Sequence, residues 1–122
     1  MGYESRLYVV EKGCINGIED NTKDKRWAEL VATFDLCKDY NLTDQFRKYP
    51  ATDCYFYEGE NAVVEDKYGD PLKEIPIADA IKIIKEESEK SEYRRLKPCL
   101  ALLEGFDISQ WGKDLVVLHF GY

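Results

Sequence analysis

The sequence contains few of the residues that carry catalysis or bind metals. One histidine, His119, and four cysteines occur in 122 residues, and the cysteines lie 23, 17 and 45 residues apart, so no CxxC pair is present. The glycines are isolated, and neither of the glycine-rich loops that hold phosphates, GxGxxG or GxxxxGKS/T, occurs. These absences predict that the chain has no metal site and binds no cofactor.

The sequence also offers no clear catalytic pair. His119 lies within an apolar run without a cysteine, aspartate or glutamate at ligand spacing, so we interpret it as a structural histidine. Carboxylate pairs such as Glu65 with Asp66 fall in polar, solvated stretches, whereas acid–base catalysis needs two unlike and partly desolvated environments. We therefore predict a protein that is not an enzyme. A catalytic site would need a pocket that joins His119 to a cysteine or a carboxylate.

Long hydrophobic runs are missing as well. No apolar stretch approaches the roughly 20 residues that cross a bilayer, and the chain opens without a basic and apolar leader. We expect a protein of the reducing cytoplasm, which makes no membrane contact. In that compartment the four cysteines are expected to be free and buried like small hydrophobic residues.

The composition is that of one folded domain with an acidic surface. Hydrophobic residues make up 44% of the chain and aromatic residues 13%, which is enough for one core, so residues 1–122 are predicted to form a single domain. The net charge is −7. A charge of this sign opposes direct binding to the phosphates of a nucleic acid and favours partners with basic surfaces.

Three segments have the periodicity of strands. Residues 5–11 and 115–120 are rich in β-branched residues, and the second is apolar throughout, which is typical of an interior strand. Residues 27–37 alternate over eleven positions and predict a half-buried strand. The side chains expected on its buried face are Ala28, Leu30, Ala32, Phe34 and Leu36.

Two helices are predicted in the second half of the chain. Pro76 suits a first helical position, and Ile77, Ile81 and Ile84 form an apolar stripe. Pro98 predicts that a second helical piece, residues 97–104, is separate and ends at Gly105 as a left-handed cap, with Cys99, Leu100, Leu102 and Leu103 as anchors.

A shorter helical signal precedes these two pieces. Thr43 is the expected N-cap of a single turn over residues 44–49, which Pro50 stops. Together with a predicted hairpin, the pattern indicates an α+β domain of about five mostly antiparallel strands, with two helical pieces packed on one face of the sheet.

That hairpin, residues 52–70, is predicted to fold about Glu58, Gly59, Glu60 and Asn61. It holds six acids and one lysine, a local net charge of −5. The two-residue period of a strand places Tyr55 and Tyr57 on one face and Phe56 on the other. We expect the tyrosine face to be displayed among the acids.

Exposed tyrosines beside carboxylates are typical of protein interfaces, since tyrosine combines apolar area with a polar tip and the acids attract a basic partner. We therefore predict that the hairpin contacts a basic surface of another protein. The residues expected to bind it are Tyr55, Tyr57, Glu58, Glu60, Glu65, Asp66, Tyr68 and Asp70.

The opening MGYESRLYVV and the stretch YPATDCYFYEGENAVVEDKYGDPLKEIP resemble small proteins encoded by phages and prophages of low-GC Gram-positive bacteria. Small acidic phage proteins of this size include anti-CRISPR and other anti-defence proteins, which commonly bind a host nuclease and block its nucleic-acid channel. The resemblance implies an inhibitor in the cytoplasm of a bacterial host, with a Cas nuclease as one such partner. It assigns a role to no individual residue.

Two alternatives remain open at the level of sequence. The nine tyrosines and two tryptophans are enough to line a pocket, so the chain is also consistent with a small-molecule or nucleotide-binding module, oligomeric or not. The acidic hairpin is equally consistent with an ordinary solvated turn whose charges serve solubility.

Overall fold

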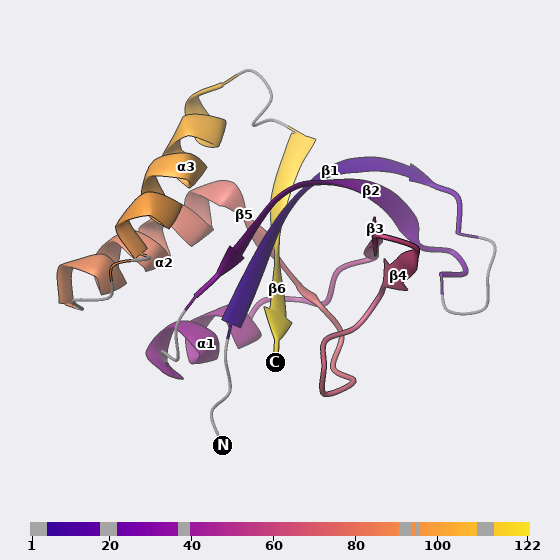
Figure 1. The fold of residues 1–122 in the computed structure, drawn as a ribbon, viewed down its shortest axis with the longest axis horizontal. Coiled ribbons are helices and arrows are strands. Elements are labelled where there is room, and N and C mark those ends of the chain that lie inside the picture. Colours follow the sequence, from indigo (N-terminus) through magenta and orange to yellow (C-terminus); the bar gives the residue numbers. More distant parts are fainter. Residues whose placement is uncertain (1–4, 18–21, 37–39, 91–93, 95, 110–113) are drawn as a thin grey trace.

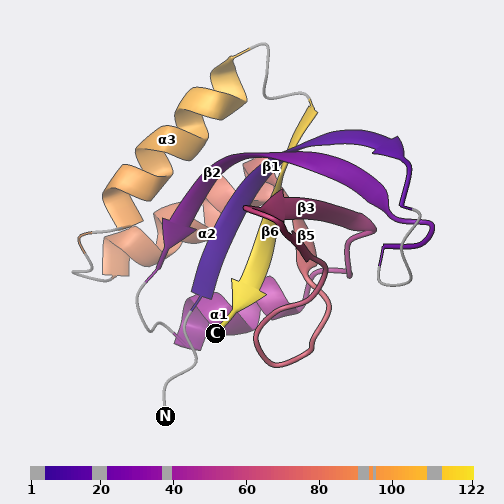
Figure 2. The same ribbon diagram turned by 45° about the vertical axis from the view of Figure 1, so that its right-hand side comes forward.

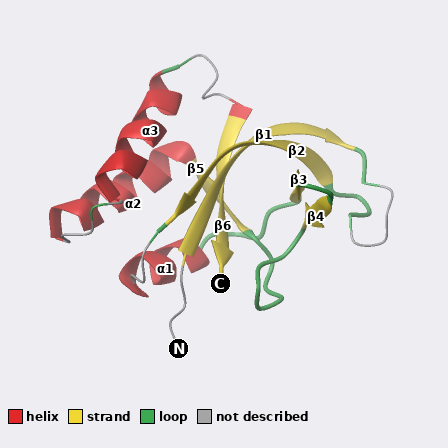
Figure 3. Ribbon diagram, viewed as in Figure 1, coloured by secondary structure: helices red, strands yellow, loops and turns green. Residues whose placement is uncertain are grey.

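Two long antiparallel strands, β1 (Ser5–Ile15) and β2 (Arg26–Asp35), form the centre of one sheet (Figure 1). The computed structural model describes residues 5–17, 22–36, 40–90, 94, 96–109 and 114–122. Within these residues it contains six strands in a single sheet and three helices, which confirms the predicted α+β class (Figure 3). The strand predicted over residues 5–11 is confirmed, and β1 continues to Ile15.

The strand order is β4-β3-β2-β1-β6-β5. β6 (Leu115–Gly121) lies between β1 and β5 (Lys73–Pro76) and is antiparallel to both, so the apolar C-terminal run is the interior strand that its composition predicts. β3 (Cys54–Glu58) is parallel to β2 and antiparallel to β4 (Asn61–Val63). The sequence did not predict β5, because four residues ending in a proline carry no readable period.

A β-bulge divides β2 into two halves that face opposite sides of the sheet. Val9 pairs with Ala32, but the next residue of β1, Val10, pairs with Leu30, so Val31 is the extra residue. Ala28 and Leu30 consequently contact one core and Ala32 the other. The prediction that all alternate residues of this strand share one face is therefore wrong.

The sheet separates two apolar cores. The helix-side core lies between the sheet and the helices, and its strand residues include Leu7, Val9 and Val117. The sheet-side core lies on the other face. The sheet curls toward that face (Figure 2). It is built from Tyr8, Val10, Ala28, Cys54, Phe56, Leu72 and Leu118.

The chain just before β3 helps to curl the sheet. Ala51 forms an antiparallel bridge with Lys73, and the N–H of Thr52 donates to the carbonyl oxygen of Leu72 at 2.9 Å. This segment therefore joins β5, at one end of the sheet, to β3, near the other end. The curled surface carries β3 and β4 on the side of the sheet away from α2 and α3 (Figure 1).

All three helices, α1 (Tyr40–Arg47), α2 (Ile77–Lys90) and α3 (Leu96–Ile108), contribute buried residues to the helix-side core. The predicted helix is present as α2, but it begins at Ile77, because Pro76 is the last residue of β5 and not the first helical residue; α2 buries Ile77 and Ile84. The helices therefore cover one face of the sheet (Figure 1).

Three expectations about the helices are wrong: the cap at Thr43, the end at Gly105 and the burial of Leu102. Thr43 lies inside α1, and its hydroxyl forms a hydrogen bond with Ser5 instead of capping. α3 is separate from α2 and contains Pro98 in its first turn, as predicted, where N–H groups lack intrahelical partners anyway, but it continues through Gly105 instead of ending there. Leu102 is 41% exposed and does not anchor the helix.

No helix among the described residues is long and apolar enough to cross a membrane. The composition of residues 107–112 predicts a turn, but Asp107 and Ile108 belong to α3, and residues 110–113 lie outside the described residues. Cys37, at the end of the predicted second strand, also lies outside them.

Candidate functional site

The predicted hairpin is present, and its turn has a specific backbone. Phe56 pairs with Val63, and Glu58 pairs with Asn61 across a two-residue loop. Gly59, the first loop residue, has φ of 66°, while Glu60 does not have a positive φ. This combination is that of a type II′ turn, which requires glycine at its first position and matches the twist of the paired strands.

Tyr55 is not displayed as predicted. Its side chain is 4% exposed, and its hydroxyl donates to Oδ1 of Asn16 at 2.8 Å. The cause is the parallel pairing of β3 with β2, which places Tyr55 opposite Trp27. Tyr57, on the same face, is 45% exposed and packs edge-on against the Tyr55 ring, so only the second tyrosine reaches the surface.

Asp66 is also buried rather than available to a partner. Its side chain is 8% exposed, and Oδ1 accepts the N–H groups of Tyr68 at 2.8 Å and Asp70 at 3.0 Å. Gly69 completes this loop with φ of 82°. Asp66 therefore holds the loop in shape, as aspartate does in Asx turns, and presents Tyr68 and Asp70 at the surface.

Glu58 is exposed but tethered to the core. Its Oε2 accepts the hydroxyl of Tyr8 at 3.0 Å, and the same hydroxyl accepts Nη1 of Arg6 at 3.2 Å. Burial raises the pKa of the Tyr8 phenol. The Arg6 guanidinium lies 4.5 Å from the centroid of the Tyr122 ring and pairs with Asp35. This chain of contacts fixes the hairpin to β1, β2 and the C-terminus.

Six of the eight predicted binding residues remain exposed, and we call them the acidic face. Tyr68 is 53% exposed, and the four carboxylates form no ion pair among the residues that the structure describes. The burial of Tyr55 depends on its pairing with β2, which local sequence does not reveal, and that of Asp66 accompanies the Asx turn within its own loop. The acidic face consists of Tyr57, Glu58, Glu60, Glu65, Tyr68 and Asp70.

A groove of about 680 Å³ lies beside the acidic face. Its apolar lining comes from β4, the loop after it and β6. The N–H of Lys67 donates to the carbonyl oxygen of Gly121 at 3.1 Å, so this loop lies against the end of β6. We call it the seam groove, and its apolar residues are Ala62, Val63, Val64, Pro71 and Phe120.

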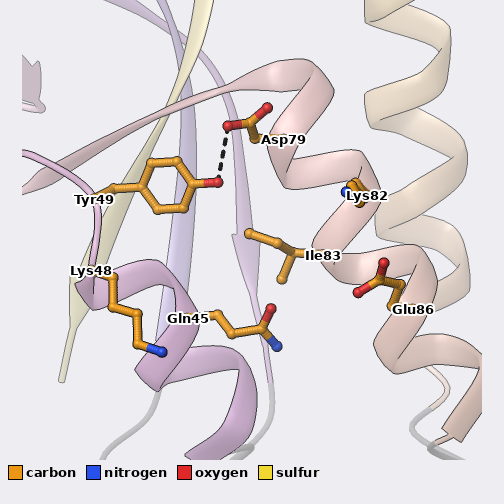
Figure 4. A pocket seen from close by; sticks show the side chains of 7 residues that line it. All are labelled: Gln45, Lys48, Tyr49, Asp79, Lys82, Ile83 and Glu86. Atoms are coloured by element: carbon orange, nitrogen blue, oxygen red, sulfur yellow. Dashed lines mark hydrogen bonds between the residues drawn. The ribbon is translucent and has the colours of Figure 1, made fainter.

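A second hollow, of about 410 Å³, lies between α1 and α2 (Figure 4). Tyr49 donates its hydroxyl to Oδ2 of Asp79 at 2.9 Å across it, and Lys48 and Lys82 stand on its two sides. Burial and Asp79 both raise the pKa of the Tyr49 phenol. The sequence has enough tyrosines to line a pocket, but among the described residues only one of them, Tyr49, lines this hollow.

His119 is 3% exposed, and its Nε2 lies 2.9 Å from Oγ of Ser5. Burial, followed by the nearby charges of Arg47 and Lys73, lowers the pKa of His119 to about 4. A cavity of about 150 Å³ joins His119 to Asp66 and Asp70, which is the juxtaposition that an enzyme would need.

Two features oppose a catalytic role for this cavity. The Ser5 hydroxyl is 1% exposed, bonds to Thr43 and does not line the cavity, so it cannot reach a substrate there. Oδ1 of Asp66 already accepts hydrogen bonds from two backbone N–H groups of its own loop. The contact of Ser5 with His119 joins residues 114 positions apart. No sequence signal indicated it.

One further cluster has the composition of a metal site. Donor atoms of Asp53, Cys54 and Glu74 lie within 4.8 Å of one another. Glu74 already accepts Nζ of Lys12 at 2.8 Å and the hydroxyl of Thr52 at 2.7 Å, so its charge is compensated by the protein itself. Burial raises the pKa of the Cys54 thiol, and the adjacent carboxylates raise it further.

The three described cysteines are free, but they differ in exposure. Cys54 and Cys99 are buried, as predicted, and burial raises the pKa of Cys99 to about 12. Cys14 is exposed, which contradicts the prediction, because it lies near the end of β1 beyond both cores. Neither buried thiol has the electropositive surroundings of a catalytic cysteine.

The chain was compared with known proteins at three levels. The chain matches no protein-family model, no curated protein and no solved structure.

Proposed function

We propose that this chain is a non-catalytic, phage-type inhibitor that binds a basic surface of a host nucleic-acid-processing defence protein, in the manner of anti-CRISPR proteins. The acidic face is the binding surface. The partner uses its basic surface to hold nucleic-acid phosphates, and a Cas nuclease is one example of such a partner.

The observation that carries the proposal is the acidic face itself. Two large tyrosine rings, Tyr57 and Tyr68, are about half exposed and stand among four exposed carboxylates. The carboxylates lie on a hairpin whose turn, strand pairing and Asp66 loop are fixed by hydrogen bonds. A fixed surface loses little conformational entropy on binding, which favours affinity.

The chemistry of the face suits a basic partner. Carboxylates attract lysine and arginine and accelerate the encounter, and tyrosine rings supply apolar area and stack with guanidinium groups. Carboxylates held at fixed spacings can also occupy the positions at which the partner would bind phosphates. An inhibitor of this kind competes with nucleic acid and needs no catalytic residue.

Affinity capture from bacterial lysate with charge-reversed variants tests the proposal. The test variant replaces Glu60, Glu65 and Asp70 by lysine. A control variant replaces three exposed acids of α2 and α3, Glu89, Glu104 and Asp107, by lysine. It therefore changes the net charge by the same amount as the test variant. The wild type and the control are expected to retain a partner that salt releases and that the test variant does not capture. Equal capture by all three proteins contradicts the proposal.

The alternative is a small-molecule or nucleotide-binding module, and the hollow between α1 and α2 is the observation that favours it. Its volume falls in the range of about 300–1,000 Å³ that ligand pockets have. Lys48 and Lys82 would provide positive charge for an anionic group of the ligand, and Asp79 and Glu86 line the same hollow. Native mass spectrometry decides this alternative. A co-purifying ligand that disappears in a Lys48→Glu, Lys82→Glu variant supports it, and a ligand-free protein contradicts it.

A further inference from the structure

We infer that the seam groove receives an extended, basic peptide segment of the partner, which forms a β-bridge with Ala62 and inserts one apolar side chain between Val64 and Phe120. The inference rests on the proposed function and specifies how the partner is held. It adds an apolar and a backbone contact to the electrostatic attraction of the acidic face.

The groove has the composition of a peptide site. Ala62, Val63 and Val64 provide one wall, and Pro71 and Phe120 provide apolar surface beside it. Each of the three wall residues is half-buried, so the wall is partly accessible, and Val63 also packs against the sheet-side core. An apolar peptide side chain placed there would remove its own surface and that of the groove from water, which is favourable.

The backbone of Ala62 supplies a donor and an acceptor at the sheet edge. β4 is the last strand of the sheet, and Glu58 and Asn61 close a two-residue hairpin as a hydrogen-bonded pair. The alternation of antiparallel pairs then makes Tyr57 and Ala62 a non-bonded pair, so the N–H and C=O of Ala62 point away from β3. An extended peptide beside β4 would pair with both groups.

Charge selects a basic occupant. Glu60, Glu65 and Asp70 are exposed around the groove, and Glu65 is one of its lining residues. Lys25 is the single basic residue of the lining, which leaves acids in excess around the site. Lysine or arginine on either side of the apolar anchor would therefore lie beside carboxylates.

The probe is a short synthetic peptide of alternating valine and lysine, added to the ¹⁵N-labelled wild-type protein and followed by NMR. We expect shifts at Val64 and Phe120 and slower amide exchange at Ala62. Two matched peptides provide the controls. One replaces lysine by glutamate, and the other is fully N-methylated, which keeps every side chain but cannot donate to the Ala62 carbonyl oxygen. The N-methylated peptide is expected to bind about tenfold more weakly.

Three results overturn the inference: no binding of the lysine peptide, equal binding of the glutamate peptide, or binding that leaves Ala62 exchange unchanged. In the last case the shifts would map to Tyr57, Glu60 and Tyr68, and the acidic face would still bind basic chains without the groove. Failure of the proposed function has a different signature, since it appears as lysate capture that charge reversal does not alter.

Discussion

His119 links the stability of the protein to pH at a single residue. Its pKa is about 4 in the folded protein, against 6.5 for an exposed histidine, because it is buried near Arg47 and Lys73. Between these two values the unfolded chain takes up a proton that the folded protein excludes. The free energy of unfolding therefore falls as the pH decreases from about 6.5 to about 4, by up to about 3 kcal/mol, and is unaffected by this group above that window.

Urea unfolding at a series of pH values measures this effect, with His119→Gln as the control because glutamine retains a partner for Ser5. Above pH 5 most carboxylates remain ionised, so the slope there belongs mainly to the histidine. The variant is expected to lose that slope. Parallel curves for the two proteins would show that His119 is not the responsible group.

The Tyr8 hydroxyl is the second residue-scale test, because it joins Arg6 to Glu58 beneath the acidic face. Tyr8→Phe keeps the ring, which contacts Phe56 and Phe120, and removes only these hydrogen bonds. We expect a loss of about 1 kcal/mol in the free energy of unfolding by urea denaturation. Tyr57→Phe, at an exposed hydroxyl, is expected to change it by less than about 0.5 kcal/mol. Similar losses in both variants would argue against the tether.

At the scale of residues, the sequence predicted that the candidate site is acidic and contains tyrosine, but it was less accurate about which residues are exposed there. Alternation placed Phe56 in a core correctly, because that choice depends on β3 alone. Tyr55 is buried by its pairing with Trp27, and Asp66 by the N–H groups of the loop after it. The burial of Tyr55 therefore depends on a tertiary contact, and that of Asp66 on a local turn, and the two-residue period of a strand contains neither.

At the scale of elements, Gly105 shows how a helix can include a residue that usually ends one. It lies inside α3 and has open space where a Cβ would stand. Gly105→Ala is therefore expected to raise the free energy of unfolding by about 0.5–1 kcal/mol, since alanine restricts the unfolded chain and favours helix. Thermal and urea unfolding measure the change.

Gly59→Ala is the matched control, because Gly59 also has open space but a φ of 66°. Alanine is strained at that angle, so this variant is expected to be less stable than the wild type. Opposite signs would confirm that backbone conformation, and not side-chain crowding, decides both outcomes. Destabilisation by Gly105→Ala would contradict the continuous helix.

The elements that the sequence predicted best are those with a long or strong local pattern. α2, β6 and the hairpin are present because an apolar stripe, an apolar run and a glycine-containing turn each determine structure locally. The bulge at Val31 was missed because both halves of β2 alternate normally, and only their pairing with β1 reveals the change of face. β5 is defined by its partner β6 and by little of its own sequence.

At the scale of the whole molecule, the fold separates two surfaces with different chemistry. The helices cover one face of the sheet, and the curled other face carries the hairpin and the C-terminal end of β6 (Figure 2). The seam groove lies between these two segments. Residues 52–70 account for −5 of the net charge of −7. Their hairpin strands lie away from α2 and α3, while Asp66 and Asp70 share a cavity with Arg47 of α1. This separation allows a partner to contact the acidic face without displacing the helix layer.

Displacement of labelled nucleic acid from the captured partner tests the central claim most directly. Wild-type protein and the variant with lysine at positions 89, 104 and 107 are expected to release the nucleic acid, and more weakly as salt is raised. The variant with lysine at positions 60, 65 and 70 is expected to release none. A stable complex that contains protein, partner and nucleic acid together, or equal release by all three proteins, would contradict the account.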